Sequence, residues 1–244
     1  MSQFFTIHPD NPNPRLIRQA AAVLRGGGIV VYPTDSCYAL GCHLDDKNAV
    51  TRIRQIRQLD EQHNLTLMCR DLSEISRYAR VDNSKFRLLK SNTPGSYTFI
   101  LEATKEVPRR LQHPKRSTIG IRVPDHPVAL ALLEELGEPM SSSTLILPDE
   151  EWPLNDAERI RELLEKKVEL VIDGGAVGSE FTTVIDLTGD VPVLVRRGKG
   201  DIAPFGIEEM QGGSHPPFID MAGTKNFCPG TGVTRPTKIM ETKN

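Results

Sequence analysis

Apolar residues recur every three or four positions over residues 13–25, a spacing that predicts an amphipathic helix. A run of three glycines then ends this helix by left-handed capping, and the continuous apolar run at 29–32 predicts a buried strand. The small polar residues Thr-Asp-Ser follow directly at 34–36. Because α/β proteins commonly bind ligands where strands end, we expect this segment to contribute to a site.

The chain continues to alternate between helical and extended patterns up to about residue 196. Such interleaving favours an α/β fold, with a twisted mixed sheet flanked by helices, over a helical bundle or a β-sandwich. The pattern does not define the order of the strands. Helices are predicted at 47–57, 72–79, 84–90, 127–136 and 156–167, and strands at 65–68, 97–103, 118–123, 141–147, 170–173, 183–187 and 193–196.

From about residue 199 the apolar periodicity is lost, and glycine, proline, threonine and other polar residues dominate to the end. Nothing in this stretch is expected to bury a core of its own. We therefore predict one folded domain at residues 10–203 and a largely disordered tail at residues 204–244.

Composition and charge leave the class of partner open. The 244 residues are 38% hydrophobic and 25% charged, as in ordinary globular proteins, and 30 basic against 32 acidic residues give a net charge of -2. This balance neither demands nor excludes a nucleic acid. We see no secretory signal and no apolar run of roughly 18 residues, so we predict a cytoplasmic protein without a membrane segment.

The common signatures of nucleotide-binding loops, hydrolases and metallopeptidases are absent from the sequence, so the candidate chemistry depends on scattered polar residues. The cysteines lie far apart, without the paired spacing of zinc sites or disulfide frameworks. We expect reduced thiols, no bound metal ion and no organic cofactor. The cysteines are Cys37, Cys42, Cys69 and Cys228.

Hydroxyl side chains cluster at 34–36, 141–144 and 182–183, each beside an apolar stretch. Such clusters can donate hydrogen bonds to phosphate or carboxylate oxygens, or they can cap strands and form turns. Both interpretations stay open from the residues alone.

Two arginines lie in strands that are otherwise apolar. Arg122 follows Ile-Gly-Ile in a predicted strand, so its guanidinium must pair either with a fixed carboxylate or with an anionic ligand. Arg196 has the same two interpretations, whereas Arg197 beside it would point to the other face. We expect only one of these two neighbours to reach the site.

Positive charge concentrates in the middle of the chain. It could form a surface stripe for RNA phosphates, although solvated helix faces are the commoner explanation. The residues concerned are Arg52, Arg54, Arg57, Arg70, Arg77, Arg80, Lys85, Arg87, Lys90, Arg109, Arg110, Lys115 and Arg116.

Five segments, in order and at matching spacing, resemble the YrdC-type threonylcarbamoyl-adenylate synthases, and among these the YciO branch in particular. The resemblance extends over residues 10–203. It implies a YrdC-like twisted open sheet with a large concave pocket. The five segments are 32–41 (YPTDSCYALG), 93–101 (TPGSYTFIL), 118–127 (TIGIRVPDHP), 173–175 (DGG) and 182–187 (TTVIDL).

The resemblance also implies a reaction that joins L-threonine, bicarbonate and ATP into threonylcarbamoyl-adenylate and releases pyrophosphate. This product serves the t6A modification of tRNA. ATP would enter with Mg²⁺ as a substrate, and tRNA or double-stranded RNA is an open alternative partner.

Carried over by position, the resemblance assigns two groups of binding residues and no catalytic residue. Adenylate formation needs charge neutralisation and close alignment more than a dedicated acid or base. The threonine side comprises Thr34, His63, Arg122, Ser141 and Thr182, and the nucleotide side comprises Arg57, Thr118, Ser143 and Arg196.

The chain departs from the family pattern at two places. A Lys-x-Arg pair corresponds here to Arg57-Gln58-Leu59, and a Ser-x-Asn motif corresponds to Ser143-Thr144-Leu145. Two alternatives to synthesis therefore stay open. One is a non-catalytic binder of double-stranded RNA or tRNA, and the other is a hydrolase that acts on the threonylcarbamoyl group.

Overall fold

The computed structural model describes residues 1–60, 65–148, 150–207, 218–219 and 225–226. Within these ranges the strands are β1 (Gln3–Thr6), β2 (Val30–Pro33), β3 (Tyr38–His43), β4 (Thr66–Met68), β5 (Tyr97–Glu102), β6 (Thr118–Arg122), β7 (Met140–Thr144), β8 (Leu170–Asp173), β9 (Thr183–Asp186), β10 (Val193–Arg196), β11 (Phe218–Ile219) and β12 (Lys225–Asn226). The helices are α1 (Pro14–Arg25), α2 (Lys47–Arg57), α3 (Leu72–Tyr78), α4 (Asn83–Asn92), α5 (Pro127–Leu136) and α6 (Ala157–Leu164), with short 3₁₀ turns η1 (Arg109–Leu111) and η2 (Ala203–Phe205).

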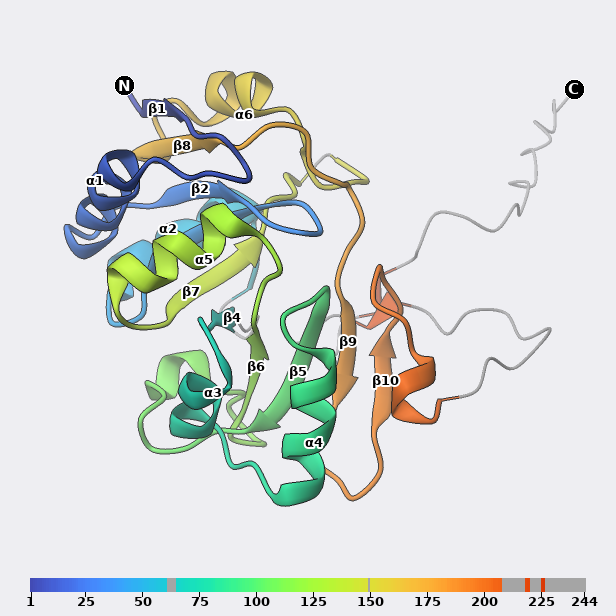
Figure 1. Ribbon diagram of the computed structural model, residues 1–244. Coiled ribbons are helices and arrows are strands. Elements are labelled where there is room, and N and C mark those ends of the chain that lie inside the picture. Colours follow the sequence, from blue (N-terminus) through green and yellow to red (C-terminus); the bar gives the residue numbers. More distant parts are fainter. Residues whose placement is uncertain (61–64, 149, 208–217, 220–224, 227–244) are drawn as a thin grey trace, which may run out of the picture.

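Ten of these strands form one open mixed sheet in the order β1-β8-β2-β3-β7-β4-β6-β5-β9-β10 (Figure 1). Parallel pairs such as β1 with β8 and β5 with β9 occur beside antiparallel pairs such as β2 with β3 and β5 with β6. The predicted α/β class and the mixed sheet flanked by helices are thus confirmed.

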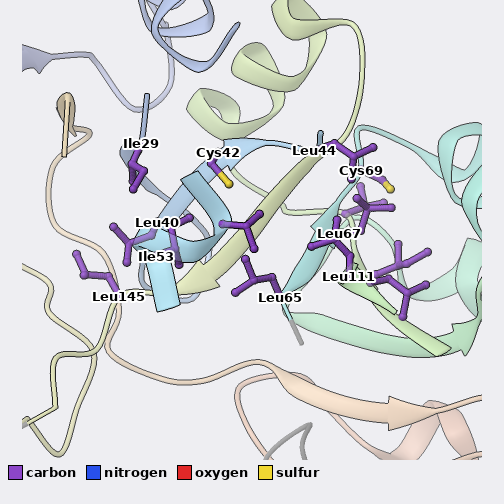
Figure 2. Packing of buried hydrophobic residues seen from close by; sticks show 14 of the residues in the cluster. Ile29, Leu40, Cys42, Leu44, Ile53, Leu65, Leu67, Cys69, Leu111 and Leu145 are labelled. Carbon is purple, nitrogen blue, oxygen red and sulfur yellow. The ribbon is translucent and has the colours of Figure 1, made fainter. Parts of the chain in front are cut away.

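Two apolar cores hold the helices on the sheet. Helices α1 and α5 lie side by side over β2 and β8 and share the smaller core with them (Figure 1). The larger core extends along the sheet, where Ile29, Leu40, Ile53 and Leu145 belong to one buried cluster (Figure 2). Burial of these side chains away from water is the main force that fixes the helices against the strands.

The helices begin where short polar side chains can satisfy their first backbone N–H groups. Asn13 caps α1, Asp46 caps α2 and Asp156 caps α6, each by accepting a hydrogen bond from the first turn. The left-handed residue predicted after α1 is Gly27, with φ 81°, whereas Gly26 has φ −79°. The helix boundaries therefore follow local chemistry that is readable in the sequence.

Strands β1 and β3 were not among the predicted elements. Strand β3 pairs antiparallel with β2 from Val30–Gly41 to Pro33–Tyr38, so the polar segment at 34–37 forms the turn of a β-hairpin. Strand β1 pairs with β8, so the sheet begins before the predicted domain start at residue 10.

At the other end of the domain, Phe205 is buried, and its ring lies 5.4 Å from that of Tyr97 and 5.9 Å from that of Phe99. The folded part therefore includes Phe205. Most of the tail predicted at 204–244 lies outside the described residues. Within the described part of the chain, no helix has the length and apolar character needed to cross a bilayer.

Candidate functional site

The turn of the β2–β3 hairpin is closed by the hydroxyl group of Thr34. Its Oγ1 donates to the main-chain oxygen of Cys37 (2.6 Å) and lies 3.2 Å from the main-chain nitrogens of Ser36 and Cys37, which donate to it. Thr34 is 1% exposed. The turn is thus held rigidly by its own side chain, as threonine and serine turns commonly are.

Arg122, the last residue of β6, extends to this turn. Its Nη2 donates to Oδ1 of Asp35 (2.6 Å) and, at 3.5 Å, to Oγ1 of Thr34. Asp35 also accepts from the hydroxyl of Ser96 and from the main-chain nitrogen of Asp125 (3.0 Å). Of the two kinds of partner that the sequence left open for Arg122, the structure contains a fixed carboxylate, Asp35, and both side chains are buried.

The ionised form of Asp35 is favoured despite its burial. Removal from water raises the pKa of a carboxyl group, but here the guanidinium of Arg122 and the hydrogen bonds from Ser96 and Asp125 outweigh this effect. The pKa of Asp35 lies below its ordinary value, so the pair carries both charges at neutral pH.

Arg196 on β10 holds the start of β9. Its Nε and Nη2 donate to the main-chain oxygen of Thr182 (3.1 and 3.0 Å), and Nη2 also donates to Oγ1 of Thr182 (3.0 Å). The hydroxyl groups of Thr182 and Thr98 share a hydrogen bond of 2.9 Å. Arg197 is exposed, so Arg196 is the member of the pair that extends to the predicted threonine-side residue.

The third arginine, Arg57, lies at the end of α2. Its Nη1 donates to Oγ of Ser143 (2.6 Å) and its Nε to the main-chain oxygen of Ile146 (3.3 Å). Burial lowers the pKa of Arg57 to about 10, and the nearby charge of Arg196 adds to this effect. Burial likewise lowers the pKa of Arg196 to about 10.

The charges of all three arginines interact with the buried thiol of Cys37. Burial raises the pKa of this thiol, while the charges of Arg122 and Arg196 oppose the rise, and the thiol in turn interacts with Arg57. The thiol is therefore neutral, and it interacts electrostatically with guanidinium groups from three different elements. Such an arrangement suits a ligand with several negative charges, for example a carboxylate together with phosphates.

Six of the nine predicted site residues contact one another in pairs: Thr34 with Arg122, Arg57 with Ser143, and Thr182 with Arg196. Ser141 is buried on β7, paired with Cys42 and Leu67, and its Oγ has no hydrogen-bond partner among the described residues. Thr118 lies at the opposite end of β6 from Arg122, about 13 Å along the strand. His63 lies outside the described residues.

Two site residues, Cys37 and Lys199, were not predicted, and Asp35 was predicted only as a member of the site segment at 34–36. Asp35 and Cys37 belong to the hairpin turn, and their proximity to the arginines depends on the strand order. The ammonium of Lys199 donates to the main-chain oxygen of Asp35. Lys199 follows Gly198, where a Cβ would lie 2.2 Å from the main-chain oxygen of Phe181, so only glycine allows this chain path.

The two departures from the family pattern have clear structural positions. Leu145 is fully buried in the larger core, beside Leu40 and Ile53 (Figure 2). An amide at this position would be buried among apolar side chains, which costs free energy unless it is hydrogen-bonded. Leu59 follows the end of α2 and is half-buried. Neither side chain offers a hydrogen bond to a phosphate.

Much of the basic charge in the middle of the chain is already compensated. Several of these residues form ion pairs at distances of 2.8 to 3.7 Å: Arg52 with Glu169, Arg70 with Asp71 and Glu134, Lys85 with Asp82, Arg110 with Asp45, and Arg116 with Asp186. Ion pairs of this kind reduce the field available to RNA phosphates. Among the described residues, no group of three or more His, Cys, Asp or Glu is placed to hold a metal ion.

A family model for the Sua5/YciO/YrdC group, described as telomere recombination, matches residues 22–198. The chain belongs to this family. It is 63% identical over 205 residues to the uncharacterized protein YciO of Escherichia coli K12, covering 84% of this chain and all of that protein. The crystal structure of E. coli YciO matches with a TM-score of 0.81 over 84% of this chain and all of that chain.

More distant relatives carry a named activity. The chain is 31% identical over 188 residues to the threonylcarbamoyl-AMP synthase of Bacillus subtilis, which covers 76% of this chain but 54% of that enzyme. The crystal structure of Pyrococcus abyssi Sua5 complexed with L-threonine is 29% identical, with a TM-score of 0.74 over 81% of this chain and 58% of that chain. At the level of the family, the fold is therefore that of threonylcarbamoyl-AMP synthases.

Proposed function

We propose that this protein joins L-threonine, bicarbonate and ATP into threonylcarbamoyl-adenylate for the t6A modification of tRNA. The amine of threonine and bicarbonate form a carbamate with loss of water, and a carbamate oxygen then attacks the α-phosphate of ATP and displaces pyrophosphate. The observation that supports this proposal is that each of three arginines contacts a predicted hydroxyl residue: Arg122 contacts Thr34, Arg57 contacts Ser143 and Arg196 contacts Thr182.

Apart from the amine of threonine, the groups brought together in this reaction are anions, so the site must neutralise charge and hold the groups in line. Arg122, Thr34 and Thr182 would bind the threonine side, where a planar carboxylate suits a guanidinium. Arg57, Ser143 and Arg196 would bind the phosphates of ATP, which enters with Mg²⁺. A solved Sua5 with bound L-threonine supports the assignment of threonine as substrate.

The test measures pyrophosphate release from ATP by the full-length chain with Mg²⁺ and saturating bicarbonate, with and without L-threonine. We expect release that depends on threonine, together with threonylcarbamoyl-adenylate detected by mass spectrometry. Arg196→Met should lower the rate at least roughly tenfold, because it removes charge-assisted hydrogen bonds at the site. Arg197→Met is the matched control and should leave the rate unchanged. Pyrophosphate release at the same rate with and without L-threonine would overturn the proposal.

A second candidate is hydrolysis of the threonylcarbamoyl group, on an adenylate or on modified tRNA. The observation that favours it is the apolar burial of Leu145 together with Leu59, which leaves two fewer polar side chains for a triphosphate. Water would then cleave the bond from the carbamoyl carbon to AMP or to the adenosine of tRNA, and the released carbamate of threonine would decompose to threonine and carbon dioxide. Incubation with t6A-containing tRNA distinguishes the two reactions, since hydrolysis restores unmodified adenosine without ATP.

A third outcome, RNA binding without chemistry, remains measurable in the same preparations. Binding through phosphate contacts weakens steeply as salt rises. Tight tRNA binding that falls between low and high salt, with no turnover of ATP, threonine or t6A, would favour the binding function over both reactions.

A further inference from the structure

The side chain of Asp35 connects two parts of the sheet that are not neighbours in the order of hydrogen-bonded strands. In the sheet order, β3 and β6 are separated by β7 and β4, so no ladder of hydrogen bonds holds the hairpin turn against the end of β6. The side chain of Asp35 spans this gap with its 2.6 Å bond to Arg122.

Two further segments meet at the same residue. Ser96, which immediately precedes β5, donates to Oδ2 of Asp35, and Lys199, which follows β10, donates to its main-chain oxygen. Asp125 completes the set through its main-chain nitrogen. The hairpin turn is therefore fastened to the far half of the sheet mainly through one carboxylate.

The guanidinium of Arg122 is held at one nitrogen and left available at another. Nη2 is bound to Asp35, whereas Nε is buried and has no hydrogen-bond partner among the described residues. A buried donor without an acceptor is destabilising, and an anionic ligand that supplies the acceptor removes this cost. The fixed side of the guanidinium thus sets where the ligand's oxygen must lie.

We propose that Asp35 is a positioning residue, which holds the guanidinium of Arg122 so that its remaining donors meet the carboxylate of the substrate. The inference rests on the proposed function, because it takes L-threonine as the ligand of Arg122. Asp35 acts through its acceptor oxygens and through Arg122, and its own charge does not contact the substrate.

Two substitutions separate positioning from charge. Asp35→Asn keeps an oxygen that accepts from Arg122, so the affinity for L-threonine should stay within roughly threefold of the native value. Asp35→Ala removes the acceptor and should weaken threonine binding roughly 100-fold, the size of effect expected for a displaced binding group. Calorimetric titration of L-threonine in the presence of ATP and Mg²⁺ gives both values. If Asp35→Asn binds L-threonine as weakly as Asp35→Ala does, the proposal is overturned.

The action through Arg122 is tested in a second background. In Arg122→Lys the planar guanidinium is gone, so adding Asp35→Ala should change threonine affinity by less than roughly threefold. A loss as large as in the native background would overturn the proposal. Asp10→Ala is the matched control for charge, because Asp10 is exposed and, like Asp35, acts electrostatically on the neighbouring His126. This control should bind threonine with native affinity.

A measurement made without ligand tests this inference independently of the proposed function. Nuclear magnetic resonance of arginine side chains should show a slowly exchanging Nε–H for Arg122 in the native chain and in Asp35→Asn, and rapid exchange in Asp35→Ala. If threonine does not bind the native chain, the proposed function is wrong, and the exchange pattern then tests the remaining part of the inference, that Asp35 holds the guanidinium of Arg122. Equal protection in Asp35→Ala would then overturn it.

Discussion

The three arginines of the site form two groups that differ in their surroundings. Arg122 is 5% exposed and forms an ion pair with the carboxylate of Asp35. Arg57 and Arg196 instead donate to hydroxyl and main-chain oxygens, and burial lowers the pKa of each to about 10. The charge of Arg122 is therefore stabilised by the fold, whereas the cationic forms of the other two are disfavoured by it.

This difference suggests a division of labour within the site. A cation whose pKa is lowered by its surroundings gains most from an arriving anion, because the anion restores what desolvation removed. An arginine already paired with a carboxylate gains less and is better suited to orient a ligand. We therefore expect Arg57 and Arg196 to contribute most of the affinity for phosphate, and Arg122 to orient the ligand.

The largest expected effect is on stability at Arg122. Arg122→Met leaves Asp35 buried and without its cation, which should lower the free energy of unfolding by about 3–5 kcal/mol. Arg57→Met should change it by less than about 1 kcal/mol, because it removes a charge that burial disfavours. Urea denaturation monitored by circular dichroism measures both. Equal losses in the two variants would remove the distinction between the groups.

The next largest effect is on nucleotide affinity. Arg57→Met should weaken binding of ATP with Mg²⁺ by roughly 10- to 100-fold, since one charge-assisted hydrogen bond contributes about 1.5–3 kcal/mol. Its effect on L-threonine affinity should be several times smaller. Arg52→Met, on the same helix but paired with Glu169, is the control and should bind ATP normally. A larger loss for threonine than for ATP would reverse the proposed division.

Acid should weaken the Asp35–Arg122 pair by protonating Asp35, because arginine keeps its charge at low pH. Because the pKa of folded Asp35 is lower than its ordinary value of 3.8, ionised Asp35 contributes stability above that value. This contribution is lost as the pH falls through the folded pKa. The difference in free energy of unfolding between the native chain and Asp35→Asn should therefore be constant near neutrality and shrink below about pH 4. A difference that grows in acid would contradict the assignment.

The smallest expected effect is at Lys199. Its side chain is exposed, and it donates to the main chain of Asp35, so Lys199→Met should change the free energy of unfolding by no more than about 0.5 kcal/mol. Its effect on threonine or ATP affinity should stay within a few-fold. Calorimetry of both ligands measures this, and a loss larger than that of Arg57→Met would place Lys199 among the main anion-binding residues.

The predicted helices agree with the structure because their signals are local. Caps such as Asp46 and Asp156 and the spacing of apolar residues determine where each helix begins. Strand β3 was missed because nearly all its side chains are buried, so no alternation is visible, and because Gly41 resembles a turn residue. The structure explains this glycine, since a Cβ there would lie 2.8 Å from the ring of Tyr32.

The site could be predicted only in part for a similar reason. The apolar surroundings of Arg122 were enough to require a buried carboxylate or an anionic ligand. Its actual partner, Asp35, is 87 residues earlier in the chain. This pairing depends on the order of the strands, which the hydrophobic pattern does not contain.

The strand order also has a consequence for how the chain is made. Among the residues that the structure describes, strand β1 pairs with β8 alone, so its residues leave the ribosome long before their partner at Leu170–Asp173 has been synthesised. The β2–β3 hairpin can form early, but the last arginine of the site, Arg196, emerges near the end of the domain. Pairings between distant segments slow folding and leave strand edges exposed in the meantime. Every nascent chain therefore passes through a long interval in which the hairpin exists and the site does not.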